Sequence, residues 1–496
     1  MIFQSGSARW AERCRHITAR RRSSQLISNL VRGAIVNKAN VLILLVIAVI
    51  VLCSPVNAVE FRGAWVSTWG AGFRNQQEIN ETLAAVKKAG LNALVVEVRK
   101  AGDAYYDSKI EPIASDVPAG FDPLAYTIEK AHAEGMQVHA WVVVYRVWKG
   151  KELPSDPKHV LRAHPEWRNI SYDGKTEAAE GVFLDPGIPE YREHFARVCE
   201  DIVKHYAVDG IHYDYVRYPG QDWGYSEIAL KRYYAETGAA EKPKPDDPKW
   251  LQWKRDQVTA MVKLVHDRVK AINPNVKIQA STIPWGDCPQ DFKDATPYRE
   301  VCQDWRSWME QGLIDENCPM VYSREGQESG AKYFRGWVDG TKRWSYGRSV
   351  YIGMSATWNT PEQMMQQIDA ARKGGLQGFL LFSFDKSKSR DARAEGLGKL
   401  LGPAPKLPVN HANGIDAMAA HKAFNKGIEL AKKNKLDKAI TELIKATKLD
   451  PGYAEAYFRI GRCYLRSKNA TRAHEFFEKA LAADPTHEGA RKALGE

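Results

Sequence analysis

The stretch PLAYTIEKAHAEGMQVHAWVVVYR, residues 123–146, contains the two kinds of element that decide the fold. Its first half has the apolar spacing of an amphipathic helix and stops at Gly135, a residue type that often ends helices. Its second half, from Gln137, is a run of β-branched and aromatic residues, which is typical of a buried strand. A helix that leads directly into a strand predicts one unit of an alternating α/β fold.

The same alternation extends over most of the chain. Eight short β-branched or aromatic runs are separated by amphipathic stretches, and they lie at residues 61–69, 93–99, 137–146, 209–219, 276–284, 316–323, 350–357 and 378–385. Eight β-then-α units in roughly 340 residues is the count of a closed (β/α)8 barrel. A doubly wound open sheet is the alternative, but no Gly-rich phosphate loop follows the first run. We therefore predict an α/β fold with a TIM barrel at residues 59–402.

Residues 1–58 have the composition of a targeting segment. They hold eight Lys or Arg and one Asp or Glu, a net charge of +7, which leaves only +4 of the total +11 for the rest of the chain. An apolar run at residues 41–52 follows the basic part, and a small residue, Ala58, ends the segment. This pattern predicts a secretory signal cleaved after Ala58, with an uncleaved N-terminal membrane anchor as the alternative. We therefore expect an exported protein of the periplasm or cell envelope, with no nucleic-acid partner and no membrane contact beyond such an anchor.

The C-terminal part is a separate helical region. A Pro-rich linker is predicted at residues 403–416, and residues 417–496 repeat themselves at a spacing of 34. The recurring positions are Gly427 with Gly461, Ala439 with Ala473, Ala446 with Ala480, Asp450 with Asp484 and Pro451 with Pro485. This is the tetratricopeptide signature, so a small all-α domain of two repeats and a C-terminal helix is expected. Such a domain predicts docking of a protein partner or self-association.

Carboxylates lie near the ends of two predicted barrel strands. In a barrel, the strand ends carry their side chains to the catalytic mouth at the C-terminal face, and successive residues alternate between the interior and the helices. In the run at 93–99, this alternation places Glu97 and Arg99 inward, with Arg99 at the mouth. In the run at 209–219, it places His212 and Asp214 on one face, with Asp214 near the strand end. A buried carboxylate is costly unless it is paired, so either an ion pair or a catalytic role is expected for each.

Aromatic residues gather at the same strand ends. The chain has 15 Trp, and Trp69, Trp285 and Trp358 end or follow predicted strands, while Tyr145 and Tyr322 lie near strand ends. Sugar rings present flat C–H faces that stack on aromatic rings, while carboxylates bind hydroxyls. A rim of Trp and Tyr around inward Asp and Glu therefore favours a polysaccharide substrate, although core packing accounts for some of these aromatics.

Several motifs together resemble the glycosyl hydrolase-like 10 family. They are FRGAWVSTW (61–69), VVEVRKAGDAYY (95–106), VFLDPGIPEYREH (182–194) and DGIHYDYVRYP (209–219), and the likeness extends from about Glu60 to Lys386. The resemblance implies an exported bacterial glycosidase that acts on cell-wall or extracellular glycans, with peptidoglycan glycan strands as the favoured substrate. The family pattern often has paired Asp residues in the fourth strand, whereas Tyr215 stands at the second position here. Chitinase-type barrels carry further acids on that strand, and His212 and Val216 replace them.

These comparisons lead to a set of expected site residues. Asp214 is predicted to be the general acid, with Glu97 as the first choice of partner carboxylate, Asp103 as the second and Asp385 as the third. Further candidates for substrate contact, or for tuning these carboxylates, are Arg62, Arg99, Tyr145, His212, Arg217, Trp285, Tyr322 and Trp358. Neither a cofactor nor a metal ion is expected.

Two rival functions compete with a glycosidase. The first is a catalytically inactive carbohydrate-binding barrel that acts as a scaffold, which the missing second Asp favours. The second is a metal-dependent deacetylase that uses His139 or His212 with Asp214. The closely spaced pair His159 and His164 lies far along the chain from Asp214, so no convincing set of metal ligands emerges.

Overall fold

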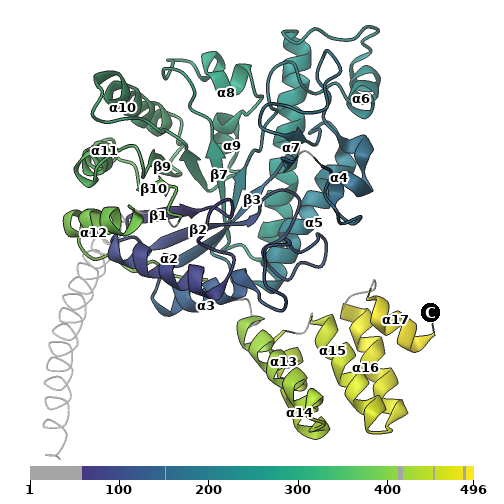
Figure 1. Cartoon of the computed structure of the whole chain (residues 1–496). Helices are drawn as coiled ribbons and strands as arrows, with labels where there is room; N and C mark the ends of the chain where they lie inside the picture. The colour runs from purple at the N-terminus through teal and green to yellow at the C-terminus, as the bar shows by residue number, and fades with distance from the viewer. Residues whose placement is uncertain are drawn as a thin grey trace, which may run out of the picture. The chain divides into compact units, whose positions relative to one another are not determined.

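The structure is a computed structural model of the chain (Figure 1). It describes residues 59–150, 152–385, 387, 389–410, 417–450, 453–483 and 487–495. The leader predicted at residues 1–58 lies outside these residues, so its role stays a prediction. In the part of the chain that is described, no helix is both long and apolar enough to cross a membrane.

The N-terminal domain is a closed barrel of eight parallel strands, as the sequence predicted. The strands are β1 (Phe61–Val66), β2 (Ala93–Arg99), β3 (Gln137–Val143), β6 (Gly210–Asp214), β7 (Lys277–Thr282), β8 (Glu316–Pro319), β9 (Ser349–Ser355) and β10 (Gly378–Phe382). Each strand pairs with the next one of the barrel along the chain, and β10 closes the ring by pairing in parallel with β1. All eight strands fall within or at the edges of the predicted runs, which confirms the barrel.

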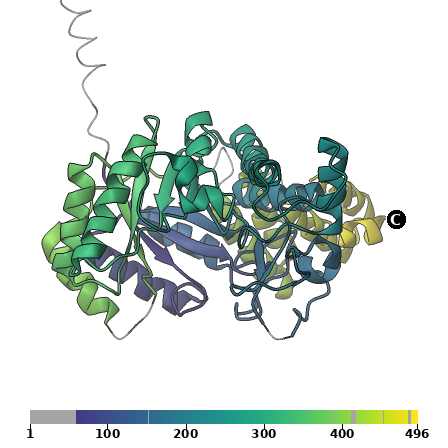
Figure 2. The same cartoon turned by 90° about the horizontal axis from the view of Figure 1, so that it is seen from above.

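Helices surround the strands on the outside (Figures 1 and 2). The outer helices are α2 (Gln76–Lys88), α3 (Pro123–Ala133), α5 (Pro189–His205), α7 (Pro248–Ile272), α9 (Trp305–Gln311), α10 (Glu328–Arg343), α11 (Pro361–Lys373) and α12 (Arg390–Leu401). Local sequence explains several starts, because the side chains of Asn75, Asp122 and Thr360 each accept a hydrogen bond from the first turn of the helix that follows. The loops add α4 (Val160–Ala163), α6 (Glu227–Thr237) and α8 (Thr296–Arg299), together with an antiparallel pair, β4 (Arg146–Trp148) and β5 (Val182–Phe183).

The barrel has an apolar core on each side of its wall. The outer core packs the strands against the helices, while the inner core fills the barrel with residues that include Phe61, Trp65, Trp141, Tyr351 and Leu380. Gly353 makes room for Trp65, because a Cβ atom at this glycine would lie 2.7 Å from the indole ring. The barrel is therefore a packed core and not a channel, which leaves its C-terminal mouth as the place for a site.

The first part of the linker is bound to the barrel. The Pro405 carbonyl accepts a hydrogen bond from the Asn92 side chain at 3.0 Å, and the Pro408 carbonyl accepts one from Gln137 at 2.6 Å. The backbone N–H of Asn410 donates to the Asp209 carboxylate. Because these partners lie at the N-terminal ends of β2, β3 and β6, the segment up to Asn410 covers the end of the barrel opposite the mouth.

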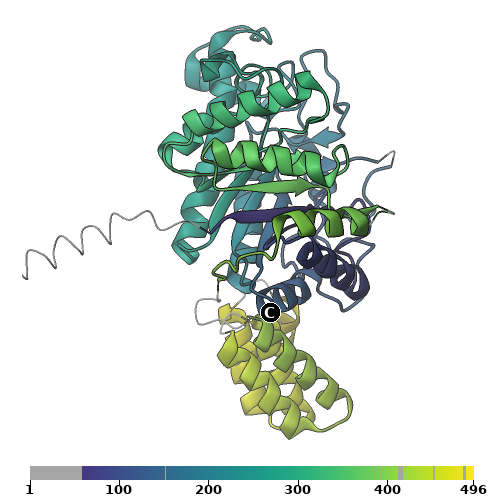
Figure 3. The ribbon, with the colours of Figure 1, turned by 90° about the vertical axis from the view of Figure 1, so that its left-hand side faces the viewer.

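The C-terminal domain consists of paired helices, which confirms the tetratricopeptide prediction (Figure 3). The helices are α13 (Ala417–Lys432), α14 (Leu436–Leu449), α15 (Ala454–Arg466), α16 (Ala470–Ala483) and α17 (Glu488–Leu494). The repeated glycines allow each pair to approach closely, since a Cβ atom at Gly427 would lie 2.7 Å from Leu443 and one at Gly461 would lie 2.5 Å from Phe477. Residues at equivalent positions therefore pack against each other in the same way in both repeats.

Candidate active site

Two carboxylates lie at the C-terminal mouth on strands that share one neighbour. Glu97 is near the end of β2 and pairs with Trp141 of β3, while Asp214 is the last residue of β6 and pairs with Val143 of β3. Asp214 therefore lies one inward-facing position closer to the mouth than Glu97. The negative charge of Asp214 contributes to the raised pKa of Glu97.

Glu97 is held by one of its two oxygens. Its Oε2 atom accepts hydrogen bonds from the Thr68 backbone N–H at 2.8 Å, the Thr68 hydroxyl at 2.9 Å and the Ser67 hydroxyl at 3.2 Å. Burial raises the pKa of Glu97 to about 7, although the Thr68 donors and the charge of Arg146 lower it in part. Because its pKa is about 7 and the side chain is only 1% exposed, a large fraction of Glu97 keeps its proton at neutral pH.

Asp214 is also held by one oxygen. Its Oδ1 atom accepts a hydrogen bond from the backbone N–H of Tyr215 at 2.7 Å. Burial raises the pKa of Asp214, and the Tyr215 N–H, Arg146, Arg217 and the indole of Trp141 oppose this rise. Within the described part of the chain, neither Asp214 Oδ2 nor Glu97 Oε1 accepts a hydrogen bond. Each carboxyl group therefore has one oxygen held by the protein and one oxygen without a hydrogen-bond donor.

Arg146 lies beside both carboxylates and was not among the predicted site residues. Its guanidinium is placed between two rings, 4.3 Å from the ring centroid of Tyr215 and 5.2 Å from that of Trp69. Nη1 donates to the Tyr215 hydroxyl at 3.2 Å. Arg146 is the last residue of the predicted strand run at 137–146, and this position at a strand end was the signal that could have found it.

A third carboxylate, Asp385, is joined to Glu97 through one residue. The Ser67 backbone N–H donates to Asp385 Oδ1 at 2.8 Å, while the hydroxyl of the same serine donates to Glu97. Burial raises the pKa of Asp385, and the Ser67 N–H lowers it in part. Ser67 and Thr68 thus position two of the predicted carboxylates, although nothing in the sequence alone singled them out.

Exposed tryptophans with stacked cations surround the carboxylates. Trp69, Trp285 and Trp358 follow β1, β7 and β9, and each is among the most exposed large apolar residues of the described chain. Lys100 lies 5.1 Å from the ring of Trp69, Arg217 lies 5.3 Å from Trp285, and Arg324 lies 5.4 Å from Trp358. Flat, exposed rings at the strand ends are suited to stacking against sugars.

Tyr322 and Asp103 also come from loops on the mouth side. Tyr322 stacks on Phe382 with ring centroids 5.3 Å apart, and burial together with the charge of Asp214 raises its pKa. Asp103 follows β2 and accepts a hydrogen bond from the backbone N–H of Ala101 at 2.9 Å. Burial raises the pKa of Asp103, and the charge of Lys100 lowers it in part.

The structure corrects the expected placement of Arg62 and Arg99. Arg62 is the second residue of β1 and lies at the opposite end of the barrel, where it pairs with Glu60 at 2.7 Å. The β2–β3 register shifts between Glu97 and Arg99, and this irregularity turns Arg99 away from the interior. Arg99 instead forms two hydrogen bonds of 2.7 Å with the buried Glu111 and contacts Phe195 of α5. Its role in the structure is to join the strand to the helix layer.

Tyr145 and His212 are likewise placed away from the mouth. Strand β3 ends at Val143, so alternation no longer applies, and Tyr145 packs in the outer core with its ring against Tyr191. His212 is fully buried inside the barrel, where Nε2 accepts from the indole N–H of Trp65 at 3.0 Å and Nδ1 donates to Gln279 at 3.0 Å. Burial lowers the pKa of His212 to about 3, so it stays neutral and contributes to the polar core.

The histidines of the deacetylase alternative do not gather around Asp214. His139 is buried at the other end of β3, His159 is bonded to the Ala101 carbonyl, and His164 stacks on Trp167. Among the described residues, no group of three His, Cys, Asp or Glu side chains has an arrangement that could hold a metal ion.

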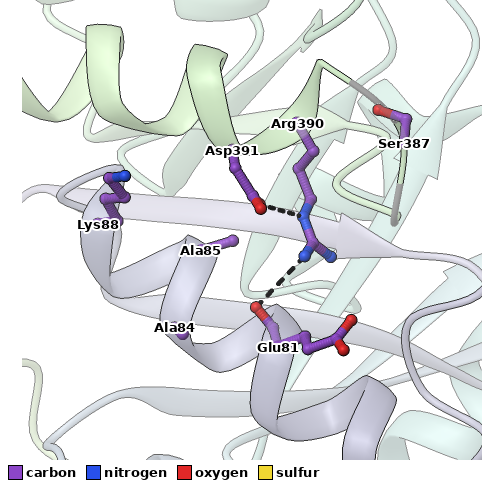
Figure 4. A pocket seen from close by; sticks show the side chains of 7 residues that line it. All are labelled: Glu81, Ala84, Ala85, Lys88, Ser387, Arg390 and Asp391. Carbon is purple, nitrogen blue, oxygen red and sulfur yellow. Dashed lines mark hydrogen bonds and ion pairs between the residues drawn. The ribbon is translucent and has the colours of Figure 1, made fainter.

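A surface pocket lies outside the barrel, between α2 and α12 (Figure 4). Arg390 extends into it and forms an ion pair with Asp391 at 3.1 Å. The pocket is lined by Glu81, Ala84, Ala85, Lys88, Ser387, Arg390 and Asp391, and none of the mouth carboxylates is among them.

The sequence of the barrel matches one protein family over most of its length. Residues 60–367 match Glycosyl hydrolase-like 10, and residues 424–488 match a Tetratricopeptide repeat family. The chain belongs to the Glycosyl hydrolase-like 10 family. This membership confirms the resemblance inferred from the motifs.

Two curated relatives of this chain are also named glycosyl hydrolases. Glycosyl hydrolase YngK of Bacillus subtilis is 30% identical over 351 residues, which are 64% of this chain and 65% of the relative. Glycosyl hydrolase DigH of Escherichia coli is 29% identical over 311 residues, which are 56% of this chain and 65% of the relative. The chain thus spans less than two thirds of either relative.

A solved structure has a similar fold. The PgaB (BpsB) glycoside hydrolase domain from Bordetella bronchiseptica has a TM-score of 0.50 and 15% sequence identity, and the match covers 68% of this chain and 99% of that domain. At 15% identity, this similarity supports the barrel fold of the chain but not a particular activity or substrate.

Proposed function

We propose that this protein is an exported glycoside hydrolase that cleaves O-glycosidic bonds of a cell-wall or extracellular polysaccharide by carboxylate acid/base catalysis. Peptidoglycan glycan strands are the favoured substrate, as the family resemblance implies. The tetratricopeptide repeats are proposed to dock a protein partner or a second copy of the chain. The basic and apolar leader supports export, and N-terminal sequencing of the mature protein tests cleavage after Ala58.

One observation carries the proposed chemistry. Glu97 and Asp214 lie near the C-terminal ends of β2 and β6, and among the described residues one oxygen of each accepts a hydrogen bond from a backbone N–H while the other accepts none. Glycosidases use two such groups, one protonated to donate to the leaving-group oxygen and one ionised. The surroundings favour Glu97 as the protonated group, because its pKa is about 7 and the charge of Asp214 contributes to that value. This division reverses the roles that the sequence favoured.

The proposed steps follow from this division. Glu97 Oε1 donates its proton to the glycosidic oxygen as the bond to the anomeric carbon breaks. In one route, Asp214 Oδ2 attacks the anomeric carbon, and a water deprotonated by Glu97 then hydrolyses the glycosyl–Asp214 bond. In the other, Asp214 Oδ2 removes a proton from a water that attacks the anomeric carbon directly, and the separation of the two carboxyl groups decides between these routes. Asp385 stays a candidate for the second carboxylate because Ser67 ties it to Glu97.

The second candidate function is a catalytically inactive carbohydrate-binding barrel. The observation that favours it is Tyr215, which stands where the family pattern often has a second Asp. The exposed tryptophans would serve binding equally well. The two functions differ in turnover and not in affinity.

The test compares the purified full chain with Asp214→Asn, Glu97→Gln and Asp267→Asn variants. Asp267 is a half-exposed carboxylate on α7 and serves as the matched control. Each protein is incubated with peptidoglycan, with glycan strands freed of stem peptides and with several exopolysaccharides, and new reducing ends are counted. We expect turnover by the wild type and by Asp267→Asn, with losses on the order of 100-fold or more in the other two variants.

Each remaining outcome contradicts part of the proposal. Unchanged turnover in Asp214→Asn or Glu97→Gln would remove that residue from the chemistry and direct attention to Asp385. Absence of turnover in the wild type, together with co-sedimentation with one of the glycans, would support the binding barrel.

A further inference from the structure

Arg146 is a buried cation at the mouth without a direct carboxylate partner. It is the first residue of β4, only 7% exposed, and it forms no ion pair with any carboxylate of the described chain. Burying a guanidinium without a counter-charge is costly. Here the compensation comes from a short distance away, because the charge of Arg146 lowers the pKa of both Glu97 and Asp214.

Tyr215 connects this arginine to Asp214. The tyrosine has a left-handed backbone conformation, with φ of 51°, which is strained for a residue that carries a Cβ atom. In this conformation its ring lies against the guanidinium of Arg146 and its hydroxyl accepts a hydrogen bond from Nη1, while its backbone N–H donates to Asp214 Oδ1. One strained residue thus transmits the position of the cation to the carboxylate.

The other groups near Asp214 are less suited than Arg146 to keep its carboxylate ionised. Arg217 also lowers the pKa of Asp214, but its guanidinium donates to both oxygens of Glu180 at 2.8 and 3.0 Å. The remaining neighbours are Glu97 from β2, Trp141 from β3 and Tyr322 after β8, and none of them carries a positive charge.

We propose that Arg146 is a positioning residue that keeps Asp214 ionised beside a protonated Glu97, acting through its own charge and through the ring of Tyr215. This inference rests on the proposed function, since it divides the acid and base roles within the same site. Tyr215 stands where the family pattern often has a second Asp, and its pairing with Arg146 would serve to keep Asp214 ionised.

The test uses the full chain with Arg146→Gln, Arg146→Lys and Tyr215→Phe. The matched control is Arg343→Gln, which removes an exposed arginine stacked on Trp344 at the end of α10. The dependence of kcat/KM on pH is measured for each protein with the glycan that the wild type cleaves. Because the charge of Arg146 lowers both carboxyl pKa values, its removal is expected to move both limbs of the bell-shaped profile upward by about one pH unit.

The variants separate charge from position. Arg146→Lys keeps the charge, so we expect both limbs of its pH profile to stay within about half a pH unit of the wild type. Its kcat should fall, because lysine lacks the planar guanidinium that stacks on the ring of Tyr215. Tyr215→Phe removes the hydroxyl but keeps the ring, so its kcat should fall less than that of Arg146→Gln. Arg343→Gln should match the wild type in both limbs and in kcat.

Two results would overturn the inference. If Arg146→Gln raises KM and leaves both limbs in place, the arginine binds substrate and does not position Asp214. If carboxyl titrations of the substrate-free protein, followed by 13C NMR, coincide in the wild type and Arg146→Gln, the charge has no effect on the pair. The titrations need no turnover, so an inactive wild type would contradict the proposed function while the role of Arg146 is still decided.

Discussion

The backbone N–H and the hydroxyl of Thr68 both donate to the same oxygen of Glu97, at 2.8 and 2.9 Å. Both donors stabilise the ionised carboxylate and therefore lower the pKa of Glu97 against the effect of burial. We expect Thr68→Val, which removes only the hydroxyl, to raise the pKa of Glu97 above about 7 and to move the basic limb of the pH–rate profile upward. Thr68→Ser should restore the limb. A basic limb that stays in place in Thr68→Val would show that another group than Glu97 is responsible for it.

Glu97 should make the stability of the barrel fall as the pH rises. Its pKa is raised from 4.5 to about 7 in the folded protein, so between these values the folded state holds a proton that the unfolded chain releases. Stability is therefore highest below pH 4.5 with respect to this group and is lost as the pH rises through 7, by roughly 3 kcal/mol at most. Glu97→Gln lacks this loss and retains an oxygen for the Thr68 donors.

The measurement is the free energy of unfolding of the wild type and Glu97→Gln from pH 4.5 to 8. We expect the difference between the two proteins to grow in favour of the variant as the pH rises. A constant difference across this range would mean that Glu97 is already ionised at low pH in the folded protein.

Arg99 is expected to contribute to stability and not to catalysis. It forms a buried, two-point pair with Glu111. Burial raises the pKa of Glu111, but the charges and hydrogen bonds of Arg99 and His194 together hold it well below its usual range. Removing Arg99 leaves the buried Glu111 with His194, 3.3 Å away, as its remaining partner, so Arg99→Met should lose about 3 kcal/mol of unfolding free energy. The double variant Arg99→Met with Glu111→Met should lose less than the single one.

Denaturant unfolding of the single and double variants checks this expectation, with turnover measured well below the unfolding transition. A folded Arg99→Met protein that has normal stability but a much reduced kcat would return Arg99 to the active site.

The exposed tryptophans are expected to act in substrate binding. Trp285 and Trp358 are 42% and 47% exposed, so nearly half of the surface of each is available to a sugar ring. Loss of one stacking surface on replacement with Ala should raise KM roughly three- to tenfold with little change in kcat. Tyr346→Ala is the matched control, because this exposed ring is stacked by Arg306 but precedes β9 and therefore lies toward the opposite end of the barrel. Equal effects of all three substitutions on KM would argue against stacking at the mouth.

The linker up to Asn410 is expected to stabilise the barrel. Its carbonyl and N–H groups bond to Asn92, Gln137 and Asp209 at the N-terminal end. Asp209 in turn accepts hydrogen bonds from the Val138 backbone N–H and His132. Asn410→Gly, which keeps the N–H but loses the side-chain contacts to Val208 and Asp209, should cost about 1 kcal/mol of unfolding free energy. The same free energy in wild type and variant would show that this segment is not bound in solution.

The sequence predicted those features that depend on periodicity along the chain. Eight runs of β-branched and aromatic residues became eight strands, and the spacing of 34 between Gly427 and Gly461 became two repeats with equivalent packing. Alternation also predicted that Glu97 and Asp214 face the barrel interior, because inside a regular strand each second residue must face the same side.

The tertiary structure decided what happens where that regularity stops. The register shift after Glu97 turned Arg99 outward, and beyond the end of β3 at Val143 the predicted Tyr145 packs in the outer core. Hydrogen bonds from Thr68, on a different strand end, hold Glu97, and no local pattern reveals a partner 29 residues away. The sequence by itself determined which strands form and which carboxylates they carry. The closed barrel decided which of these groups meet and which one keeps its proton, because burial and neighbouring charge arise only when distant strand ends come together.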